Sequence, residues 1–300
     1  MSSAEPSAAP SARPGSGVPV ALLAAALLAL FVLDTSLLSN GSPAHHVLRP
    51  AAAPDGAPPS LTSLQPGLGK FAPLPGSDEI SFNVIVTSTG RAELPVFMAA
   101  LAPQLTARDY ITLISDKPSW HLHVAETFSH VRCNCTKLLI ENAEPLGWWG
   151  HGSRNKWQRS LPGAFHLHAD DDDLYTPDAF EHIRRAVVDL SPRVYIFRLV
   201  RRWDGEIGLI PPMSVTRPEQ IVPGAVSTQN GVIRAIPELY LDWPYLYGGD
   251  GHFYKALVER FGYDNVTIVP AVTYHFGQRE NLLPLVPQLL AAEGVDLKLK

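Results

Sequence analysis

Four consecutive aspartates, Asp170 to Asp173, follow a short apolar run in the segment AFHLHADDDD. Carboxylates this close repel one another, and each raises the pKa of its neighbours unless a positive charge lies among them. Mg²⁺ or Mn²⁺ would cancel that repulsion, because both prefer carboxylate oxygens and the oxygens of phosphate groups. Asp170 and Asp172 point to one side of an extended chain and are the expected metal ligands, with Asp173 beside them. Alternatively, the run is a solvated turn before a helix, whose N-terminus favours acidic residues.

Short apolar runs alternate with amphipathic segments from residue 80 onward, which predicts an α/β domain with a mostly parallel sheet flanked by helices. In such a sheet, ligands bind at the carboxyl ends of the strands, where Asp116 and the four aspartates fall. A helix is expected to have Thr176 as its N-cap and Pro177 in its first turn. The expected strands are 80–88, 110–116, 136–141, 164–169, 193–200 and 266–275, and the expected helices are 91–105, 152–161 and 176–190.

The N-terminal part of the chain divides by composition. A short tail, 1–17, precedes the apolar segment 18–38, which has about the length that a helix needs to cross a bilayer. We expect this segment to be a transmembrane signal anchor, and a cleaved signal peptide is the alternative. Residues 39–77 are rich in Pro, Ala, Gly and Ser and are expected to form a disordered stem. The folded domain is then 78–300.

Charge, cysteines and glycosylation sequons give further expectations. The net charge is −5 and no Lys/Arg-rich run occurs, which argues against nucleic acid as a partner. Cys133 and Cys135 form a C-x-C pair, whose close spacing is unfavourable for a disulfide, so we expect two thiols. N-glycosylation sequons at Asn40, Asn134 and Asn265 permit a lumenal location.

Several segments together resemble one enzyme family. FHLHADDDDLYTPDAF resembles the strand, D-x-D motif and proline-headed helix of GT-A fold glycosyltransferases, particularly the family-2-like group. NVIVTSTGR is similar to their first strand and nucleotide-binding loop, which implies donor contacts by Thr87 and Arg91. LISD resembles the second strand, whose Asp116 would contact the base or ribose. GHGSRNKWQ resembles the helix with an Arg-Asn pair, which places Arg154 and Asn155 at the donor.

The resemblance, which covers about residues 80–278, implies a metal-dependent reaction on a Rossmann-like GT-A sheet. Asp170, Asp172 and Asp173 would bind Mn²⁺ or Mg²⁺, Asp170 and Asp171 would contact the nucleotide sugar, and His275 would complete the coordination. A hydrogen-bonded surface histidine is the alternative for His275. The acidic run departs from the family pattern by being one residue longer, which leaves the choice of metal ligands open.

The segment LYGGDGHFYKALVERFG resembles the part of the family that opens a helix and supplies the general base, here Asp250. Asp250 would accept a proton from an acceptor hydroxyl, and a single displacement would invert the sugar, although retention is not excluded. Gly248 and Gly249 precede Asp250 where the family carries a second acid. The implied acceptor is a glycan, protein or lipid. The implied location is the Golgi or endoplasmic reticulum membrane, as a single-pass type II protein with a lumenal catalytic domain.

For several other residues, a role in packing is the alternative to a role in the site. Trp243 is the expected acceptor platform, although tryptophan is also common in cores. His166 and His168 are expected to pack rather than to bind metal, and Arg201 and Arg202 either meet phosphate or support a strand edge. Two other functions remain open: a non-catalytic, cation-dependent ligand-binding module, and a nucleotidyltransferase on a similar fold.

Overall fold

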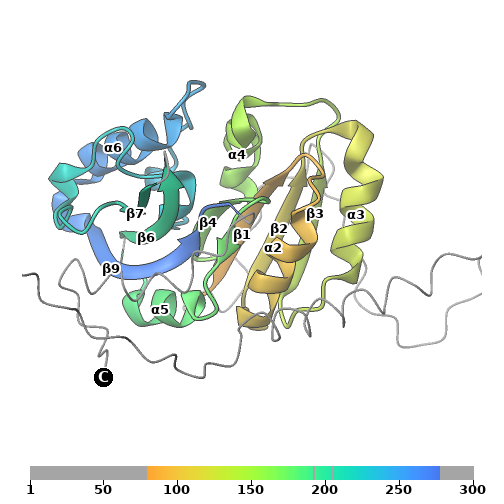
Figure 1. The fold of residues 1–300 in the computed structure, drawn as a ribbon, viewed down its shortest axis with the longest axis horizontal. Coiled ribbons are helices and arrows are strands. Elements are labelled where there is room, and N and C mark those ends of the chain that lie inside the picture. Colours follow the sequence, from red (N-terminus) through yellow and green to blue (C-terminus); the bar gives the residue numbers. More distant parts are fainter. Residues whose placement is uncertain (1–79, 192, 204–205, 278–300) are drawn as a thin grey trace, which may run out of the picture. The chain divides into compact units, whose positions relative to one another are not determined.

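The computed structural model describes residues 80–277 except 192 and 204–205 (Figure 1). The predicted tail (1–17), signal anchor (18–38) and stem (39–77) lie outside the described residues. Within the described ranges, no helix is both long and apolar enough to cross a membrane.

One mixed sheet organises the described part of the chain, in the order β3-β2-β1-β4-β8-β6-β9-β5, with β7 paired to β6. The strands β3, β2, β1 and β4 are parallel, and β6 is parallel to β9. The pairs β4–β8, β6–β8, β6–β7 and β5–β9 are antiparallel. The strands are β1 (Phe82–Ser88), β2 (Tyr110–Ser115), β3 (Thr136–Glu141), β4 (Phe165–Asp170), β5 (Leu174–Tyr175), β6 (Val194–Trp203), β7 (Glu206–Ile210), β8 (Gly231–Arg234) and β9 (Val266–His275).

The expectation of a mostly parallel sheet is therefore right for the first half of the domain and wrong for the second. A parallel pair needs a crossover, usually a helix, to return the chain to the same end of the sheet. The segment between β7 and β8 contains only turns and short 3₁₀ segments, and β8 returns antiparallel to both of its neighbours. The result is a mixed α/β fold.

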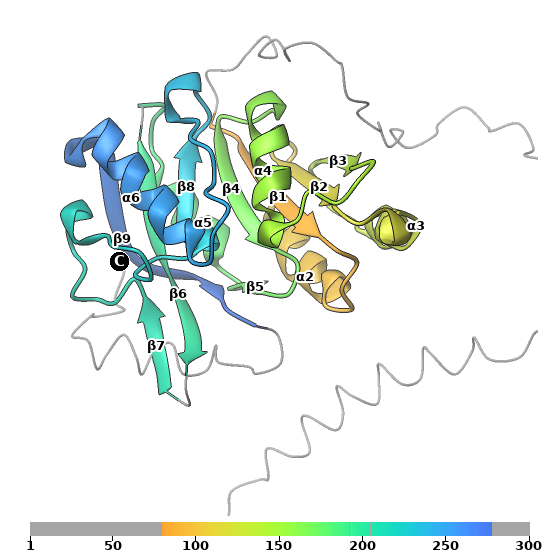
Figure 2. The same cartoon turned by 90° about the horizontal axis from the view of Figure 1, so that it is seen from above.

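Helices cover both faces of the sheet, because strand side chains alternate between the faces. Phe82, Val84 and Val86 of β1 pack into the core formed with α2, α3 and α5, whereas Ile85 packs on the opposite face with Trp157 of α4. Figure 2 shows α4 and α6 in front of the strands. The helices are α2 (Leu94–Leu101), α3 (His121–His130), α4 (His151–Trp157), α5 (Ala179–Ala186) and α6 (Gly249–Phe261).

Most predicted elements are confirmed within a few residues, but one cap is wrong. Asp178, not Thr176, is the N-cap of α5. The Thr176 N–H donates to the Thr273 carbonyl at 3.0 Å, and its hydroxyl donates to the Val272 carbonyl at 3.3 Å. Thr176 therefore extends the contact of β5 with β9, and the helix begins later. The structure also contains α3, β5, β7 and β8, which were not expected from the sequence.

The C-x-C pair is oxidised, so the expectation of two thiols is wrong. Cys133 and Cys135 form a disulfide directly before β3, and their Cα atoms are 5.2 Å apart. This separation lies within the range of ordinary disulfides, because the chain bends between the two residues instead of forming a helix or strand there.

Candidate active site

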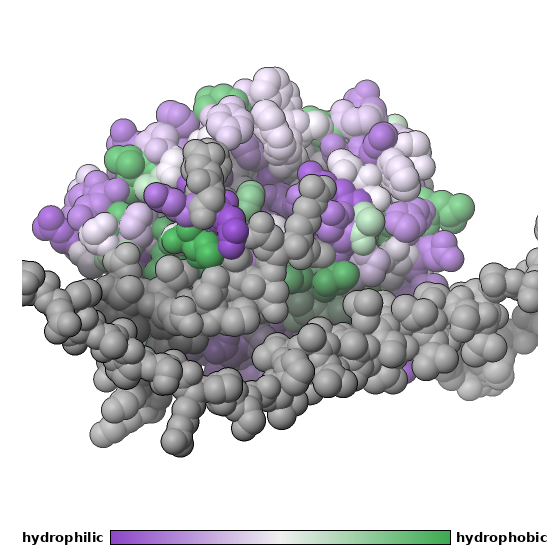
Figure 3. All heavy atoms as spheres, viewed as in Figure 1, coloured by the Kyte–Doolittle hydropathy of each residue, from purple (hydrophilic) through white to green (hydrophobic). Residues whose placement is uncertain are grey.

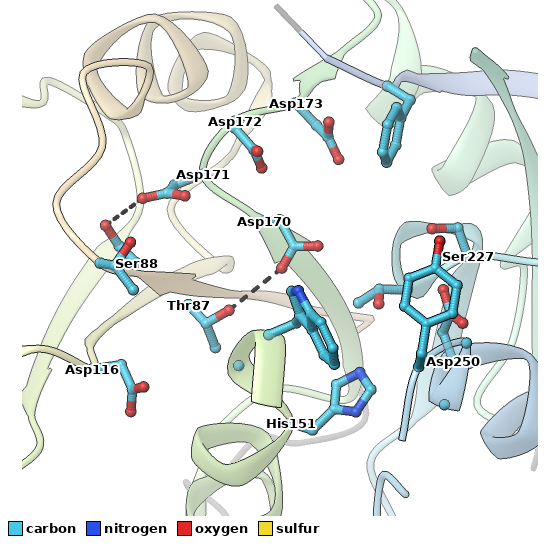
Figure 4. A pocket seen from close by; sticks show the side chains of 18 of the residues that line it. Thr87, Ser88, Asp116, His151, Asp170, Asp171, Asp172, Asp173, Ser227 and Asp250 are labelled. Carbon is cyan, nitrogen blue, oxygen red and sulfur yellow. Dashed lines mark hydrogen bonds between the residues drawn. The ribbon is translucent and has the colours of Figure 1, made fainter. Parts of the chain in front are cut away.

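The carboxyl ends of β1, β2 and β4 meet at one edge of the sheet. The parallel register places Thr87 beside Asp170 and Ser88 beside Ser115, so that Asp116 follows at the same edge. A cavity of about 610 Å³ opens there. Figure 4 shows Asp170 between Thr87 and the opposite wall, which carries Ser227 and Asp250. The fold therefore brings together residues from both halves of the domain.

The four aspartates of the acidic run do not share one environment. The side chain of Asp170, at the end of β4, is 29% exposed, and that of Asp172 is 43% exposed. Asp171 and Asp173 are each only 2% exposed. The two carboxylates most accessible from the cavity are therefore the D-x-D pair.

Asp171 and Asp173 are held by the surrounding chain. Asp171 accepts a hydrogen bond of 2.5 Å from the Ser88 hydroxyl, and the Arg91 guanidinium lies 3.5 Å away. Asp173 accepts a bond of 2.7 Å from the Gly277 N–H. Burial outweighs these contacts, and it raises the pKa of Asp171 to about 6 and that of Asp173 well above its usual value. The buried pair therefore forms part of the wall of the site.

Arg154 is a fully buried cation beneath Asp170. Its Nη2 lies 2.5 Å from Asp170 Oδ1 and donates to Thr87 Oγ1 at 3.2 Å. The other oxygen of Asp170 accepts a bond of 2.7 Å from Gln229 Nε2, which also donates to Asp173 at 2.8 Å. Arg154, predicted to contact the donor, is buried and positions the Asp170 carboxylate instead.

Asp116 organises the loop that follows β3. It is 5% exposed, and both of its oxygens accept hydrogen bonds. The donors are Asn142 Nδ2 at 2.9 Å, Ser153 Oγ at 2.6 Å, and the N–H groups of Leu146 at 3.0 Å and Gly147 at 2.9 Å. Asp116 lines the cavity, which is compatible with the predicted contact to a nucleotide. That contact stays a prediction.

Asn155 and Trp243 do not face the cavity. The Asn155 side chain donates to the Trp243 carbonyl at 2.9 Å and accepts from the Trp243 N–H at 2.6 Å. The Trp243 ring is 1% exposed and stacks on Phe253, with the ring centroids 3.9 Å apart. The structure contradicts an acceptor platform at Trp243, because a buried ring has no free face to offer a sugar.

The predicted ligand His275 ends β9 and is fully buried, and it does not line the cavity. Among the described residues, no three His, Cys, Asp or Glu side chains form a group that could hold a metal ion. Mg²⁺ is commonly bound by one or two carboxylates together with waters and substrate phosphates, so a third protein ligand is not required. The accessible oxygens of Asp170 and Asp172 fit such an ion. His275 stays a prediction that this placement does not support.

Arg91 lies at the entrance to the acidic run. Its guanidinium forms an ion pair with Asp172, and its side chain is 41% exposed. Arg201 also lines the cavity, whereas Arg202 does not. Positive side chains from β6 and from the loop after β1 thus face the same space as the carboxylates.

Asp250 lies in the first turn of α6, and its Oδ1 accepts a bond of 2.8 Å from the Gly251 N–H. The preceding Gly249 allows a close approach, because a Cβ there would lie 2.5 Å from the Pro244 carbonyl and 2.9 Å from His151 Cε1. His151 Nδ1 lies 2.8 Å from the same carbonyl, so Nδ1 must carry the proton. Burial lowers the pKa of His151, which favours the neutral ring.

Several residues of the site were not expected from the sequence. Gln229 lies in a 3₁₀ segment with no motif around it, and His151 lies one residue before the expected helix. Ser227 and Tyr247 line the cavity from loops. The sequence offers one signal for these residues, which is the dense aromatic and glycine content near Asp250. The positions of the other residues depend on the conformation of loops, which the sequence does not show.

No protein-family model and no curated protein sequence matches the chain. The fold is similar to that of S. aureus TarS. Residues 1–349 of TarS align with a TM-score of 0.50 at 15% identity, over 74% of this chain and 67% of that one. The same region of TarS in complex with UDP-GlcNAc aligns with a TM-score of 0.51 at 14% identity, over 67% of this chain and 60% of that one. The longer TarS structure has a TM-score of 0.53 at 14% identity, over 74% of this chain and 41% of that one. At these identities the likeness concerns the fold alone.

Proposed function

We propose that this chain is a glycosyltransferase that moves a sugar from a nucleotide-sugar donor to an acceptor hydroxyl with the help of Mn²⁺ or Mg²⁺. The observation that carries the proposal is the pair of accessible carboxylates, Asp170 and Asp172, in one cavity with Asp250 on the facing wall. The similarity of fold to TarS, which has been crystallised with UDP-GlcNAc and with UDP, supports a nucleotide sugar as the donor.

On the donor side, the chain provides a preorganised anionic pair. Arg154 and Gln229 fix the carboxylate of Asp170 from below, so that its orientation does not depend on the ligand. A divalent cation, when bound by Asp170 and Asp172, supplies positive charge for the diphosphate of the donor. Arg91 lies beside Asp172 and can offer a further positive charge to the phosphates.

On the acceptor side, Asp250 is the proposed general base. Its carboxylate takes the proton of the acceptor hydroxyl while that oxygen forms a bond to the anomeric carbon. The bond between the anomeric carbon and the diphosphate oxygen breaks, and both electrons leave with the nucleoside diphosphate. Attack from the face opposite the leaving group inverts the configuration of the sugar.

We further propose a type II arrangement in the Golgi or endoplasmic reticulum membrane, with residues 18–38 as the signal anchor. The Cys133–Cys135 disulfide supports an oxidising compartment, because structural disulfides are rare in the cytosol. The exposed sequons at Asn134 and Asn265 are compatible with the same lumen.

The proposal is tested with the full chain in detergent and a panel of nucleotide sugars, by measuring release of the nucleoside diphosphate. Release is expected from one donor with Mn²⁺, and it should be lost with a chelator or with Asp172→Asn. Asp178→Asn is the matched control, because Asp178 is 57% exposed and does not line the cavity. Each donor is tried alone and with simple saccharide or peptide acceptors.

Three outcomes separate the candidate functions. Release that needs both Mn²⁺ and Asp172 supports the transferase and identifies the donor. Mn²⁺-dependent thermal stabilisation without release from any donor–acceptor pair would instead favour a ligand-binding module. Release of pyrophosphate rather than a nucleoside diphosphate, with nucleoside triphosphates added, would identify a nucleotidyltransferase.

A further inference from the structure

Four exposed aromatic side chains lie together at the cavity entrance, and we call them the aromatic rim: Trp148, Trp149, Tyr245 and Tyr247. Their exposed fractions are 50%, 61%, 52% and 78%. Trp148 and Tyr245 have ring centroids 5.9 Å apart, and Trp149 and Tyr247 have centroids 6.0 Å apart. Two loops almost one hundred residues apart in the chain thus present paired rings to the solvent.

The backbone of the first loop is strained so that it can present these rings. Trp148 has φ +54° and Trp149 has φ +52°, and they are the only residues besides glycine with positive φ in the described ranges. Such a conformation is unfavourable for a bulky residue, and it persists where the surroundings fix it, commonly at binding sites. Arg154 Nη1 holds the loop by donating to the Trp149 carbonyl at 2.9 Å. The donor side of the site therefore also fixes the rim.

The rim continues into the cavity of the proposed active site. Trp149 and Tyr247 line that cavity together with Asp250, and Tyr247 precedes Asp250 by three residues. The Pro244 carbonyl, at the start of the second loop, is bonded to His151 on the helix that follows the first loop. The two loops are thus joined beside the proposed general base.

We propose that the aromatic rim binds a carbohydrate unit of the acceptor, so that the acceptor is a glycan or a glycoconjugate. This inference rests on the proposed transferase function. A pyranose ring has an apolar face of C–H groups that packs on Trp and Tyr rings, and its edge carries hydroxyl groups. Polar side chains for those hydroxyls line the same cavity, namely Arg201, Ser227 and Asp250.

A lipid surface fits this region less well than a sugar does. Burial of the rim in a bilayer would remove water from the adjacent charged side chains of Asp250 and Arg201, and the desolvation of charged groups is costly. In the view of Figure 3, the part of the surface that is not grey is mostly hydrophilic, with hydrophobic residues in separate small groups. A hydroxylated ligand that is apolar on one face satisfies both the rings and the charged residues.

Saccharide binding is measured without donor, by saturation-transfer NMR on the full chain in detergent, with chitobiose, lactose and mannobiose as probes. At least one disaccharide is expected to bind. Binding should become about tenfold weaker or undetectable in Trp149→Ala and in Tyr247→Ala, as is typical when an aromatic anchor is removed. Tyr263→Ala is the matched control, because Tyr263 is 47% exposed and lies outside the cavity.

Donor binding is measured separately by calorimetry with nucleotide sugars, so that the two proposals fail independently. Donor binding with no disaccharide binding, or equal disaccharide binding by the rim variants and the wild type, would overturn the inference. Disaccharide binding that needs the rim, without any donor binding, would support the rim and count against the transferase. In nanodiscs of brominated phosphatidylcholine, fluorescence quenching that disappears when Trp148 and Trp149 are both replaced by Phe would identify a lipid occupant and overturn the inference.

Discussion

The two walls of the cavity are built in different ways. On the donor wall, at the ends of β1, β2 and β4, polar side chains are buried and multiply bonded: Arg154 is fully buried, and Asp116 accepts four hydrogen bonds. On the acceptor wall, before and within the first turn of α6, Tyr247 is 78% exposed, and Asp250 bonds to the backbone of the next residue. The donor wall is held by a network of buried hydrogen bonds, whereas the acceptor wall presents exposed side chains.

This difference matches what each wall is proposed to do. Positioning a diphosphate requires carboxylates held within a fraction of an ångström, which strand ends and buried partners can provide. Selecting an acceptor requires a surface that can vary without disturbing the sheet, and loops provide it. The contrast leads to four predictions about how replacements on and near the two walls should behave.

The largest effect is expected on catalysis at the acceptor wall. Asp250→Asn should lower the turnover number by about 10²–10⁴, because the acceptor hydroxyl loses its base. Donor affinity should stay close to that of the wild type, because Asp250 lies on the wall facing the donor carboxylates. Steady-state kinetics and calorimetry measure the two quantities. Asp242→Asn, at a 66% exposed position, is the control, and equal turnover in both variants would exclude Asp250 as the base.

The next largest effect concerns folding at the donor wall. Arg154→Met should lower the free energy of unfolding by about 3–5 kcal/mol, because Asp170 loses its buried partner. The matched control is Arg159→Met, which removes an exposed ion pair with Asp242 and should cost about 0–1 kcal/mol. Urea unfolding followed by circular dichroism gives both values. A similar loss in the two variants would mean that the donor wall is no more tightly held than the surface.

The strand beneath the donor wall gives a pH-dependent effect. Burial lowers the pKa of His166 on β4 to about 4, so the native state keeps this ring neutral while the unfolded chain binds a proton near pH 6.5. Stability from this group is therefore complete above about pH 6.5, and roughly 3 kcal/mol of it is lost as the pH falls to about 4.

His166→Gln should remove this part of the pH dependence, as measured by urea unfolding at neutral and acidic pH. His123→Gln, at an exposed position of α3, should leave the dependence as it is in the wild type. An unchanged pH profile in His166→Gln would show that the ring is not protected from protonation in the native state.

The smallest effect tests the bridge between the acidic run and the second half of the domain. Gln229→Met should lower the free energy of unfolding by about 1.5–3 kcal/mol in cation-free protein, because the side chain loses its bonds to the carboxylates of Asp170 and Asp173. Mn²⁺ added with UDP should recover part of the loss by taking over the neutralisation. Thermal unfolding with and without these ligands measures the change, and no loss in Gln229→Met would contradict the bridging role.

Much of the donor wall could be predicted from sequence, because its strands are recognised from short local patterns of residue types. Strands β1, β2, β3 and β4 are continuous apolar runs that end at polar residues, and parallel strands place those ends together. The choice of Asp170 and Asp172 as the accessible pair was also predicted, but from an extended chain, whereas β4 ends at Asp170 and the chain turns there. The burial of Asp171 and Asp173, by contrast, depends on Ser88 and Gly277, which are far away in the sequence.

The acceptor wall was predicted less well, for a physical reason. Trp243 and Tyr247 are aromatic residues four positions apart, yet one is 1% and the other 78% exposed. Residue type cannot separate them, because Asn155 and Phe253 bury Trp243 through contacts that only the folded chain creates. The antiparallel β8 was missed for the same reason, because its pairing with β4 and β6 arises only in the folded chain.

The sequence by itself determined the order of strands and helices in the first half of the domain, the position of the acidic run at a strand end, and Asp250 at the start of a helix. Tertiary structure decided which aspartates face the cavity, that Arg154 and Gln229 hold Asp170, and that Trp149 and Tyr247 form an exposed rim beside Asp250. Periodicity and capping are local properties of the chain, whereas burial and side-chain pairing arise between segments up to a hundred residues apart.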